Sequence, residues 1–442
     1  MRLVSALLLA TGLAVAGLVA GCAPRAVAPP AMSADPLASP VIYEVFVRSV
    51  TPEGTLRAAT ARLDSIRALG VDVVWLMPIH PVGERDRKGR LGSPYAVRDY
   101  RGVDPALGTL DDVRAFTARA HALGMRVILD WVANHTAADH PWIAAHPEWY
   151  TAAPDGSRPT PPAGTDWTDV ADLDYSAPAL HDAMIGEMAF WVREAGVDGF
   201  RCDVAEMVPL DFWRRAIPAL RAAGATFMLA EGSSPELHAA GFDATYSWTT
   251  YHALKQVWRG AASDSFAVAV EAEEREYPAG ALRMHFATNH DETSWDEAAV
   301  TLWGGPAGLR AALTVAFTLP GMPMLYNGVE ASAPERLNLF EDETVSYDGP
   351  SHRAWIARLA ALRHEVPALA TGRTTFHDVP GAIAYSRAAA GTRAFVVINP
   401  TTAPLAVALP PAAAGLTDVG GGSASPARLT LAPHEARVFT GR

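Results

Sequence analysis

The stretch RVILDWVANH spans residues 126–135 and decides how the chain can fold. Its first seven residues fit a buried β-strand, and polar residues follow them at once. Directly before it, Thr109–Leu123 carries apolar residues on one helical stripe, and Thr109 with Asp112 can form a capping box at its start. Upstream of that helix, VDVVWLM (71–77) is a second buried-strand pattern. A strand, a helix and a strand in this order predict a parallel crossover unit.

The same alternation continues on both sides of this unit. Further strand patterns occupy Val41–Arg48, Gly199–Val204, Thr226–Ala230, Phe242–Trp248, Arg283–Thr288 and Met322–Tyr326. Further helix patterns occupy Thr55–Leu69, Pro178–Ala195 and Pro209–Ala222. Eight strands alternating with helices predict an α/β fold, a (β/α)8 TIM barrel over residues 41–368. Residues 135–176 break this rhythm and are interpreted as a short excursion after the third strand. Over residues 369–442, short β-runs between Gly and Pro turns predict a C-terminal antiparallel β-sandwich.

The composition excludes several classes of protein. Half of the 442 residues are hydrophobic and 19% are charged, which excludes disorder along most of the chain. The 36 Lys and Arg against 48 Asp and Glu give a net charge of -12, which argues against a nucleic-acid-binding face. The two cysteines, Cys22 and Cys202, cannot build a disulfide framework or a Cys-rich zinc site. Cys202 is expected to be a buried thiol.

The N-terminus is typical of an export signal. After Met1-Arg2, an apolar run leads to Val19-Ala20-Gly21-Cys22, which resembles the lipobox of bacterial lipoproteins. This pattern predicts a signal peptide over residues 1–21, acylation of Cys22, and an Ala/Pro-rich tether over residues 22–40. The protein would then be an exported lipoprotein, anchored to a membrane of a bacterial cell envelope on its periplasmic side or at the cell surface. An uncleaved membrane helix is the alternative, because the apolar run nearly reaches spanning length.

Charged side chains follow several of the predicted strands, at the barrel end where reactive groups gather. The fourth strand carries Arg201 and Asp203, the fifth ends at Glu231, and the seventh runs into His290 and Asp291. Three carboxylates in one cleft cannot all ionise without cost, so at least one pKa should rise. A retaining glycosidase needs one ionised nucleophile and one acid that keeps its proton near neutral pH. Each residue alone could be a structural ion pair, a helix cap or a core histidine, but the joint pattern favours catalysis.

Four segments carry a resemblance to a known family: DWVANH (130–135), GFRCDVAE (199–206), MLAEG (228–232) and FATNHDE (286–292). They resemble the signature regions of the α-amylase superfamily, glycoside hydrolase family 13. Further matches are VVWLMPIHPVG (73–83), SPYAVRDY (93–100), DPALGT (104–109) and GMPMLYNGVE (321–330). The chain is therefore identified as a member, and is most similar to bacterial lipoprotein-type α-amylases that act on maltooligosaccharides.

The resemblance implies the catalytic roles. Asp203 would be the nucleophile, and Glu231 would protonate the departing oxygen and then activate the incoming water or sugar. Asp291 would hold the O2 and O3 hydroxyls of a distorted sugar ring. Arg201, two residues before Asp203 on a strand, points the same way, so it can hydrogen-bond that carboxylate and keep it ionised.

The resemblance also implies substrate-binding residues. His135 and His290 would bind hydroxyls of the sugar at subsite −1, and Tyr95 would stack on its face. Tryptophans near the rim could offer further apolar faces to sugars. The candidates are Trp131, Trp142, Trp167, Trp248 and Trp295. About half of these five tryptophans are expected to be core residues instead.

Departures from the family pattern bear on calcium. Members with the conserved calcium often carry a Lys-His pair three and four residues after the nucleophile, where this chain has Glu206 and Met207. Asn134 matches a usual calcium ligand, but the segment Ser49–Gly54 contains no Asp/Asn-rich calcium loop. We therefore expect no cofactor, and no metal site on which activity depends. The excursion is also shorter than the B domain of large α-amylases, which implies an open cleft.

The expected reaction is retaining hydrolysis of α-1,4-glucosidic bonds in maltooligosaccharides or starch, by a monomer. Hydrolysis and transglycosylation use the same catalytic residues, so an α-glucanotransferase or an α-1,6-acting relative is the alternative. A remote alternative is an inactive carbohydrate-binding lipoprotein, which is disfavoured because Asp203, Glu231 and Asp291 are all present. The acidic net charge suits a neutral sugar as partner and no nucleic acid.

Overall fold

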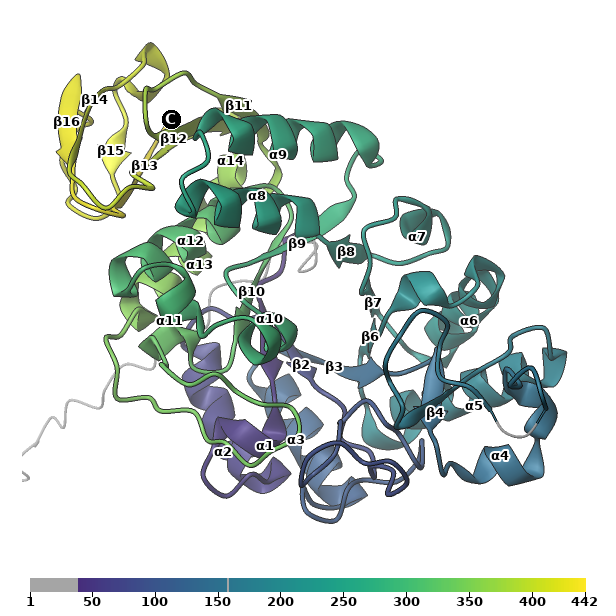
Figure 1. Ribbon diagram of the computed structural model, residues 1–442. Helices are drawn as coiled ribbons and strands as arrows, with labels where there is room; N and C mark the ends of the chain where they lie inside the picture. Colours follow the sequence, from purple (N-terminus) through teal and green to yellow (C-terminus); the bar gives the residue numbers. More distant parts are fainter. Residues whose placement is uncertain (1–38, 157–158) are drawn as a thin grey trace, which may run out of the picture. The chain divides into compact units, whose positions relative to one another are not determined.

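Eight parallel strands close into a barrel in the computed structural model (Figure 1). They are β1 (Ile42–Val45), β2 (Val73–Leu76), β3 (Arg126–Trp131), β6 (Gly199–Cys202), β7 (Phe227–Ala230), β8 (Ala244–Tyr246), β9 (Leu282–Phe286) and β10 (Met322–Tyr326). They follow one another around the ring in chain order, and β10 pairs with β1 to close it. The predicted (β/α)8 architecture is confirmed.

The structure describes residues 39–156 and 159–442. The predicted signal peptide, the Cys22 lipidation site and nearly all of the predicted tether lie outside these ranges. Within these ranges, no helix combines the length and the apolar character that crossing a bilayer requires.

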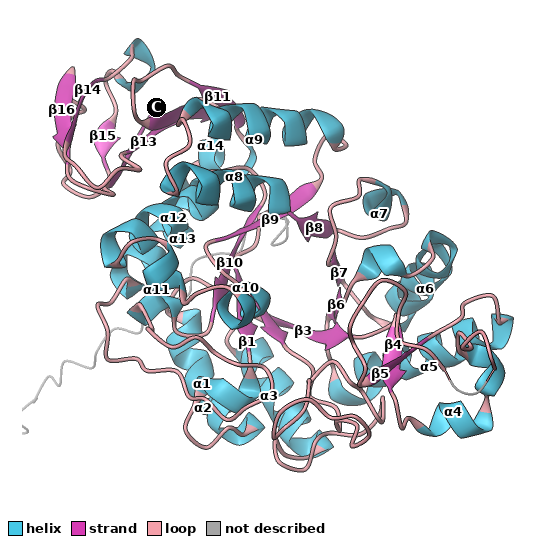
Figure 2. Cartoon of the chain, in the orientation of Figure 1, coloured by secondary structure: helices cyan, strands magenta, loops and turns pink. Residues whose placement is uncertain are grey.

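Helices surround the ring of strands (Figure 2). The longer ones are α2 (Leu56–Arg67), α3 (Leu110–Ala122), α5 (Pro178–Ala195), α6 (Leu210–Ala223), α8 (Trp248–Trp258), α9 (Asp264–Glu276), α12 (Pro306–Thr318) and α13 (Arg353–Glu365). Shorter helices and turns are α1 (Val47–Val50), α7 (Glu236–Ala239), α10 (His290–Trp295), α11 (Ala299–Leu302), η2 (Ala205–Met207) and η3 (Val329–Ala331). The capping box predicted for α3 is present, since the Thr109 hydroxyl accepts from the Asp112 N–H and the Asp112 carboxylate accepts from the Thr109 N–H.

Two predicted strands are shorter than their apolar runs. The run Val41–Arg48 leaves the barrel after Val45 and continues as the one-turn helix α1. The run Phe242–Trp248 pairs over only three residues before α8 begins. Phe46 and Val47 remain buried after β1 ends, and Trp248 is partly buried after β8 ends, so hydropathy alone could not locate the boundaries.

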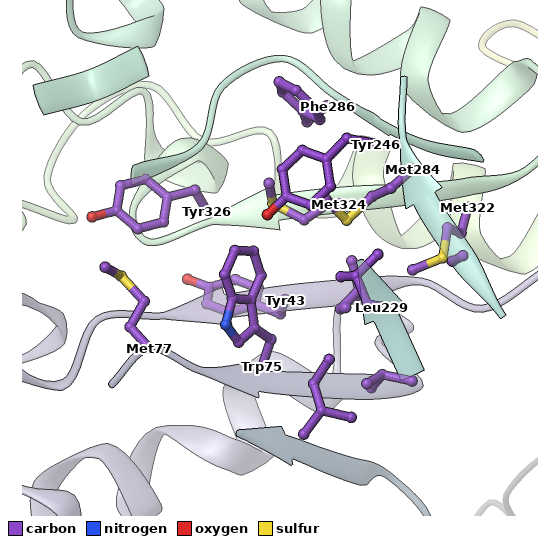
Figure 3. Packing of buried hydrophobic residues seen from close by; sticks show 14 of the residues in the cluster. Tyr43, Trp75, Met77, Leu229, Tyr246, Met284, Phe286, Met322, Met324 and Tyr326 are labelled. Atoms are coloured by element: carbon purple, nitrogen blue, oxygen red, sulfur yellow. The ribbon is translucent and has the colours of Figure 1, made fainter. Parts of the chain in front are cut away.

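Residues from neighbouring strands share the interior of the barrel. Backbone pairing places Glu44 beside Trp75, and Asp130 beside Arg201. The Arg201 guanidinium lies 5.0 Å from the centre of the Trp75 ring and 5.7 Å from that of Tyr246. Figure 3 shows how Trp75 and Tyr246 pack among apolar side chains that include Leu229, Met284, Met322 and Met324. Charged groups inside this barrel are therefore walled by aromatic and sulfur-containing side chains.

The excursion after β3 contains a two-stranded antiparallel sheet. It pairs β4 (His135–Ala137) with β5 (Val170–Asp172), and between them lie α4 (Pro141–Ala145) and η1 (Pro147–Trp149). Because only residues 132–134 separate β3 from β4, His135 is held at the C-terminal end of the barrel.

The C-terminal region is antiparallel, as predicted. A five-stranded sheet has the order β11 (Arg373–Phe376), β12 (Ile383–Ala389), β13 (Thr392–Ile398), β17 (Ala436–Gly441) and β15 (Thr417–Asp418). A second sheet pairs β14 (Leu405–Ala408) with β16 (Arg428–Leu431), and η4 (Pro411–Ala413) lies between these strands in the chain. The short helix α14 (Pro367–Thr371) crosses residue 369, where the sandwich was predicted to begin, and the first strand of the sheet begins at Arg373.

Candidate active site

A cleft with a volume of about 430 Å³ opens at the C-terminal ends of the barrel strands. Six of the seven residues predicted for catalysis and substrate binding line it: Tyr95, His135, Asp203, Glu231, His290 and Asp291. The seventh, Arg201, is fully buried and contacts the carboxylates of Asp203 and Glu231. The structure thus brings all seven predicted residues to one site.

Arg201 is the hub of this site. Its Nη1 donates to Asp203 Oδ1 at 2.8 Å and to Asp130 Oδ1 at 2.9 Å. Its Nη2 lies 2.9 Å from Glu231 Oε1, close enough for an ion pair, although the N–H is not aligned for a hydrogen bond. Its Nε donates to the Tyr246 hydroxyl at 3.1 Å. One guanidinium therefore links three carboxylates from three strands.

The two carboxyl groups at the centre of the cleft differ in their tendency to ionise. Burial raises the pKa of Asp203 to about 6, opposed by the adjacent Arg201. Burial raises the pKa of Glu231 further, to about 7, again opposed by Arg201. The order follows from the contacts, because Asp203 accepts an aligned charge-assisted hydrogen bond from Arg201 and Glu231 does not. Asp203 is therefore the group that ionises first, and Glu231 is the group that retains a proton.

The backbone after Asp203 also holds Glu231 in place. Val204 has φ +36° and ψ +48°, a left-handed conformation that costs a β-branched residue about 1–2 kcal/mol. In this conformation its N–H donates to Glu231 Oε2 at 2.7 Å. The Glu231 N–H in turn donates to the carbonyl of Cys202 at 3.0 Å. The strained turn thus fixes the position of Glu231 relative to Asp203.

The opposite wall of the cleft contains His290 between charged groups. Its Nδ1 is 2.5 Å from Glu44 Oε1, and its Nε2 is 2.7 Å from the Tyr95 hydroxyl and 3.4 Å from Asp291 Oδ2. Burial disfavours protonation of His290, but Asp291 and Glu44 outweigh burial and raise its pKa to about 9. The Tyr95 hydroxyl also donates to Asp130 Oδ2 at 3.2 Å, and its ring stacks on the imidazole.

His135 is a contrasting histidine in the same cleft. Burial lowers its pKa to about 4, so the ring is neutral at physiological pH. Its Nδ1 lies 3.3 Å from the Asn134 amide nitrogen, and its ring is 5.4 Å from that of Trp167. A neutral imidazole beside an indole suits contact with sugar hydroxyls and with an apolar sugar face.

Only two of the five candidate tryptophans line the cleft. Trp167 does so beside His135, and Trp295 does so with 62% of its surface exposed. Trp131 is fully buried in the core, Trp142 lines a separate hollow with Tyr100 and His140, and Trp248 packs on Tyr246 and Phe286. The stacking role proposed for these three is therefore not supported by their positions.

Two buried acids, Asp130 and Glu44, join the site without having been predicted. Asp130 begins the segment DWVANH, which carries part of the family resemblance, but no role was inferred for it; the only signal for Glu44 was that it interrupts an apolar strand. Burial raises the pKa of both carboxyls, to about 6 for Asp130. Their contacts with Arg201 and His290 could be found only once β1, β3, β6 and α10 were placed around one axis.

Glu206 and Asn134, two of the positions considered for calcium, make contacts within the protein. Glu206 accepts hydrogen bonds from the backbone N–H groups of Ser233 and Ser234, so it braces the loop that follows Glu231. The Asn134 backbone oxygen accepts from the Leu173 N–H at 3.1 Å. Calcium needs six to eight oxygen ligands. Across residues 39–156 and 159–442, no group of three or more His, Cys, Asp or Glu side chains is placed to hold a metal ion. Independence of calcium stays a prediction.

The comparisons with known proteins agree with this geometry. The family described as "Alpha amylase, catalytic domain" matches residues 32–158 and 164–240. The crystal structure of an α-amylase from Lactobacillus plantarum is 33% identical, with a TM-score of 0.82, over 92% of this chain and 99% of that one. The chain belongs to the α-amylase superfamily.

Sequence relatives within this superfamily have different names. The α-amylase MalA of Haloarcula japonica is 31% identical over 425 residues, covering 90% of this chain and 61% of that protein. An α-1,4-glucan:maltose-1-phosphate maltosyltransferase of Rhodospirillum rubrum is 31% identical over 382 residues, covering 75% of this chain and 52% of that protein. The chain thus spans about half to three-fifths of the length of these two α-amylase-superfamily relatives.

Proposed function

We propose that this protein is a retaining α-glycoside hydrolase that cleaves α-1,4-glucosidic bonds in maltooligosaccharides. The observation that carries the proposal is the unequal pair on one guanidinium: Asp203 with an aligned hydrogen bond from Arg201, and Glu231 without one. Such a pair supplies a carboxylate nucleophile and a proton donor at the same pH. The similarity to proteins named α-amylase supports the substrate class.

In the first step, Glu231 donates its proton to the glycosidic oxygen as the bond from the anomeric carbon to that oxygen breaks. The Asp203 carboxylate attacks the same carbon from the other face and forms a covalent β-glycosyl ester. Arg201 keeps Asp203 ionised before the attack, because its Nη1 stabilises the carboxylate. The low-dielectric, aromatic-walled interior strengthens these interactions.

In the second step, the Glu231 carboxylate removes a proton from water, and the oxygen of that water displaces Asp203 from the anomeric carbon. Two displacements at one carbon restore the α-configuration. Asp291 has a third of its side chain exposed and lies next to His290, so it can accept hydrogen bonds from ring hydroxyls while the sugar distorts. The exposed ring of Trp295 offers an apolar face to a neighbouring glucose unit.

A second candidate function is glucan or maltosyl transfer, which the similarity to a maltosyltransferase favours. In that reaction a sugar hydroxyl replaces water in the second step. The charge of the cleft argues against a phosphorylated donor. Among the described residues that line it, the carboxylates are Asp166, Asp169, Asp203, Glu231 and Asp291. The single lysine in this lining, Lys88, is 3.4 Å from Asp169 and already paired with it.

The test is a product time course on maltoheptaose with protein lacking residues 1–22. Proton NMR follows chain lengths and anomeric configuration, with and without EDTA, and a parallel reaction contains maltose 1-phosphate and maltohexaose. Shorter chains that appear first as α-anomers with EDTA present are the expected result.

Other outcomes would redirect the proposal. Products longer than seven units would show a glucanotransferase, and release of phosphate would show a maltosyltransferase. Activity that returns only with added calcium would contradict the expected independence of calcium. Cleavage of α-1,6-linked substrates in place of maltoheptaose would contradict the proposed bond specificity.

A further inference from the structure

Glu44 is an acid with no place in the mechanism above, although it touches the site. It lies in the middle of β1 and is completely buried. Its Oε1 is 2.5 Å from His290 Nδ1, and its Oε2 has no hydrogen-bond partner among the described residues. A buried carboxylate without a partner is costly, so this acid depends on its contact with His290.

When the Tyr95 hydroxyl donates to Asp130, the hydrogen bonds around His290 call for two ring protons. At Nδ1, an ionised Glu44 can only accept, so the ring must donate. At Nε2, the Tyr95 hydroxyl has one hydrogen, which it donates to Asp130 Oδ2, so its oxygen is left to accept from the ring. The second neighbour of Nε2 is Asp291 Oδ2 at 3.4 Å, which is also an acceptor. A neutral imidazole could satisfy only one of these two sides.

The local charge also favours an imidazolium. The charged and titratable groups that face His290 or its immediate partners come from every element around it: Glu44 on β1, Tyr95 after β2, Asp130 on β3, Arg201 on β6, Asp291 on α10 and Tyr326 on β10. Against Glu44, Asp130 and Asp291, the one fixed cation in this set is Arg201. A second positive charge offsets part of that excess.

We propose that Glu44 is a positioning residue that holds His290 as an imidazolium. This proposal rests on the proposed function, in which His290 lines the sugar-binding cleft. The carboxylate fixes the ring through Nδ1 and balances its charge. The ring then donates from Nε2 at the cleft wall and, with Arg201, favours the ionised form of Asp130. Glu44 itself does not touch the substrate.

The test uses the full chain with ¹⁵N-labelled histidine, and His290→Gln assigns the His290 signals by their loss. In the unsubstituted protein, both His290 nitrogens should show imidazolium shifts from about pH 6 to about pH 8, because its pKa is raised to about 9. In Glu44→Gln, the amide can still accept from Nδ1 but carries no charge, so His290 should lose a proton within that range. Each unit by which its pKa falls lowers the protonated fraction at a given high pH about ten-fold.

Activity provides the second readout. For Glu44→Gln, a fall of the His290 pKa from about 9 to about 7 would lower the protonated fraction at pH 8 from about nine-tenths to about one-tenth. The ratio of kcat/KM at pH 8 to kcat/KM at pH 6 should then fall about ten-fold relative to the unsubstituted protein. Glu330→Gln is the matched control. Glu330 is also completely buried in the barrel, but it accepts from the Tyr43 hydroxyl at 3.0 Å and does not contact His290. It should leave the His290 signals and the pH ratio unchanged.

The outcomes separate this inference from the proposed function. Neutral His290 shifts at pH 7 in the unsubstituted protein would overturn the inference even if Glu44→Gln failed to fold. An unchanged titration of His290 in folded Glu44→Gln would overturn it as well. If the histidine signals behave as expected but no α-glucan is cleaved, the pairing is supported and the proposed function is wrong.

Discussion

Within the described ranges, Arg201 is the one lysine or arginine that contacts Asp130, Asp203 and Glu231. Arg201 and Asp130 are fully buried, Asp203 is nearly so, and 14% of the Glu231 side chain is exposed, so these charges interact in a low-dielectric interior. A single cation shared among three acids leaves at least one of them protonated near neutral pH. Catalytic competence at this site is therefore a property of the cluster, and individual substitutions should act through it.

The first prediction concerns the acid. Glu231→Gln keeps the shape of the side chain but removes the proton that can be donated, so kcat on maltoheptaose should fall by about 10²–10⁴-fold. Binding of maltoheptaose, measured by isothermal titration calorimetry, should persist. Glu148→Gln, the same change at an exposed position in η1, should leave turnover unaffected. Full turnover by Glu231→Gln would show that another group is the acid.

The second prediction concerns pH. Asp203 must be ionised, so kcat/KM should fall as the pH drops below its pKa of about 6. Glu231 must be protonated, so kcat/KM should fall as the pH rises above its pKa of about 7. The profile should be a narrow bell whose two limbs belong to the interacting carboxyls together. A rate on maltoheptaose that is flat between about pH 4 and pH 9 would contradict this pairing.

At the scale of the elements, the site depends on close contact between β6 and β7, which present Asp203 and Glu231. Gly199 begins β6 with φ +155°, and a Cβ at this position would lie 1.7 Å from the backbone oxygen of Phe227 on β7. Gly186, within α5, has no atom within 4 Å of the corresponding position. The two glycines therefore form a matched pair for testing how tightly the strands must approach.

The third prediction follows from this pair. Gly199→Ala must separate β6 from β7, and we expect a loss of stability of at least about 3 kcal/mol or a failure to fold. Gly186→Ala should stabilise the protein by about 0.5–1 kcal/mol, because alanine favours the helix. Urea unfolding measures both. A stable Gly199→Ala protein with full activity would mean that the contact between these strands is not essential.

At the scale of the whole molecule, the C-terminal sheet is joined to the barrel by a buried arginine. Arg387 on β12 donates to the carbonyl of Thr318 at the end of α12, and its Nε donates to the carbonyl of Gly372 at 3.0 Å. The Tyr385 hydroxyl lies 2.5 Å from the Thr318 Oγ1. These contacts predict that the sheet supports the barrel that carries the site.

The fourth prediction tests this coupling. Arg387→Met leaves the carbonyls of Thr318 and Gly372 unsatisfied, which should cost about 2–4 kcal/mol. All 12 tryptophans lie between residues 75 and 355, so tryptophan fluorescence reports unfolding of the barrel and not of the sheet. The barrel transition should move to lower urea in Arg387→Met but not in Arg373→Met, which alters an exposed arginine of the same sheet. An unmoved barrel transition would show that the two parts unfold independently.

The fifth prediction concerns membrane attachment, which we propose from the N-terminal sequence alone. Cys22→Ser removes the thiol that a lipid would occupy, so metabolic labelling with a fatty acid should stop and the protein should leave the membrane fraction. An acyl chain and an apolar helix are distinguished by this substitution, since a helix would still hold the variant in the membrane. Labelling that persists would contradict acylation at this cysteine.

The sequence by itself determined the barrel, because strand and helix periods are local properties and their alternation allows few topologies. It also located seven residues of the site, some from their places on predicted strands and the others from motifs that resemble the family. Asp130 and Glu44 were missed because the role of a charged residue inside an apolar run depends on partners that are far away in the chain. Glu44 and His290 are 246 positions apart.

The tertiary structure alone decided which side chains are exposed and which titratable groups lie close enough to change one another's pKa. Trp131 and Trp295 both occur near the predicted rim, yet one is fully buried and the other is 62% exposed. His135 and His290 both follow strands in signature motifs, yet burial keeps the first neutral while adjacent carboxylates keep the second protonated. The physical reason is that pKa values and exposure depend on neighbours within a few ångströms, and closure of the barrel sets those neighbours.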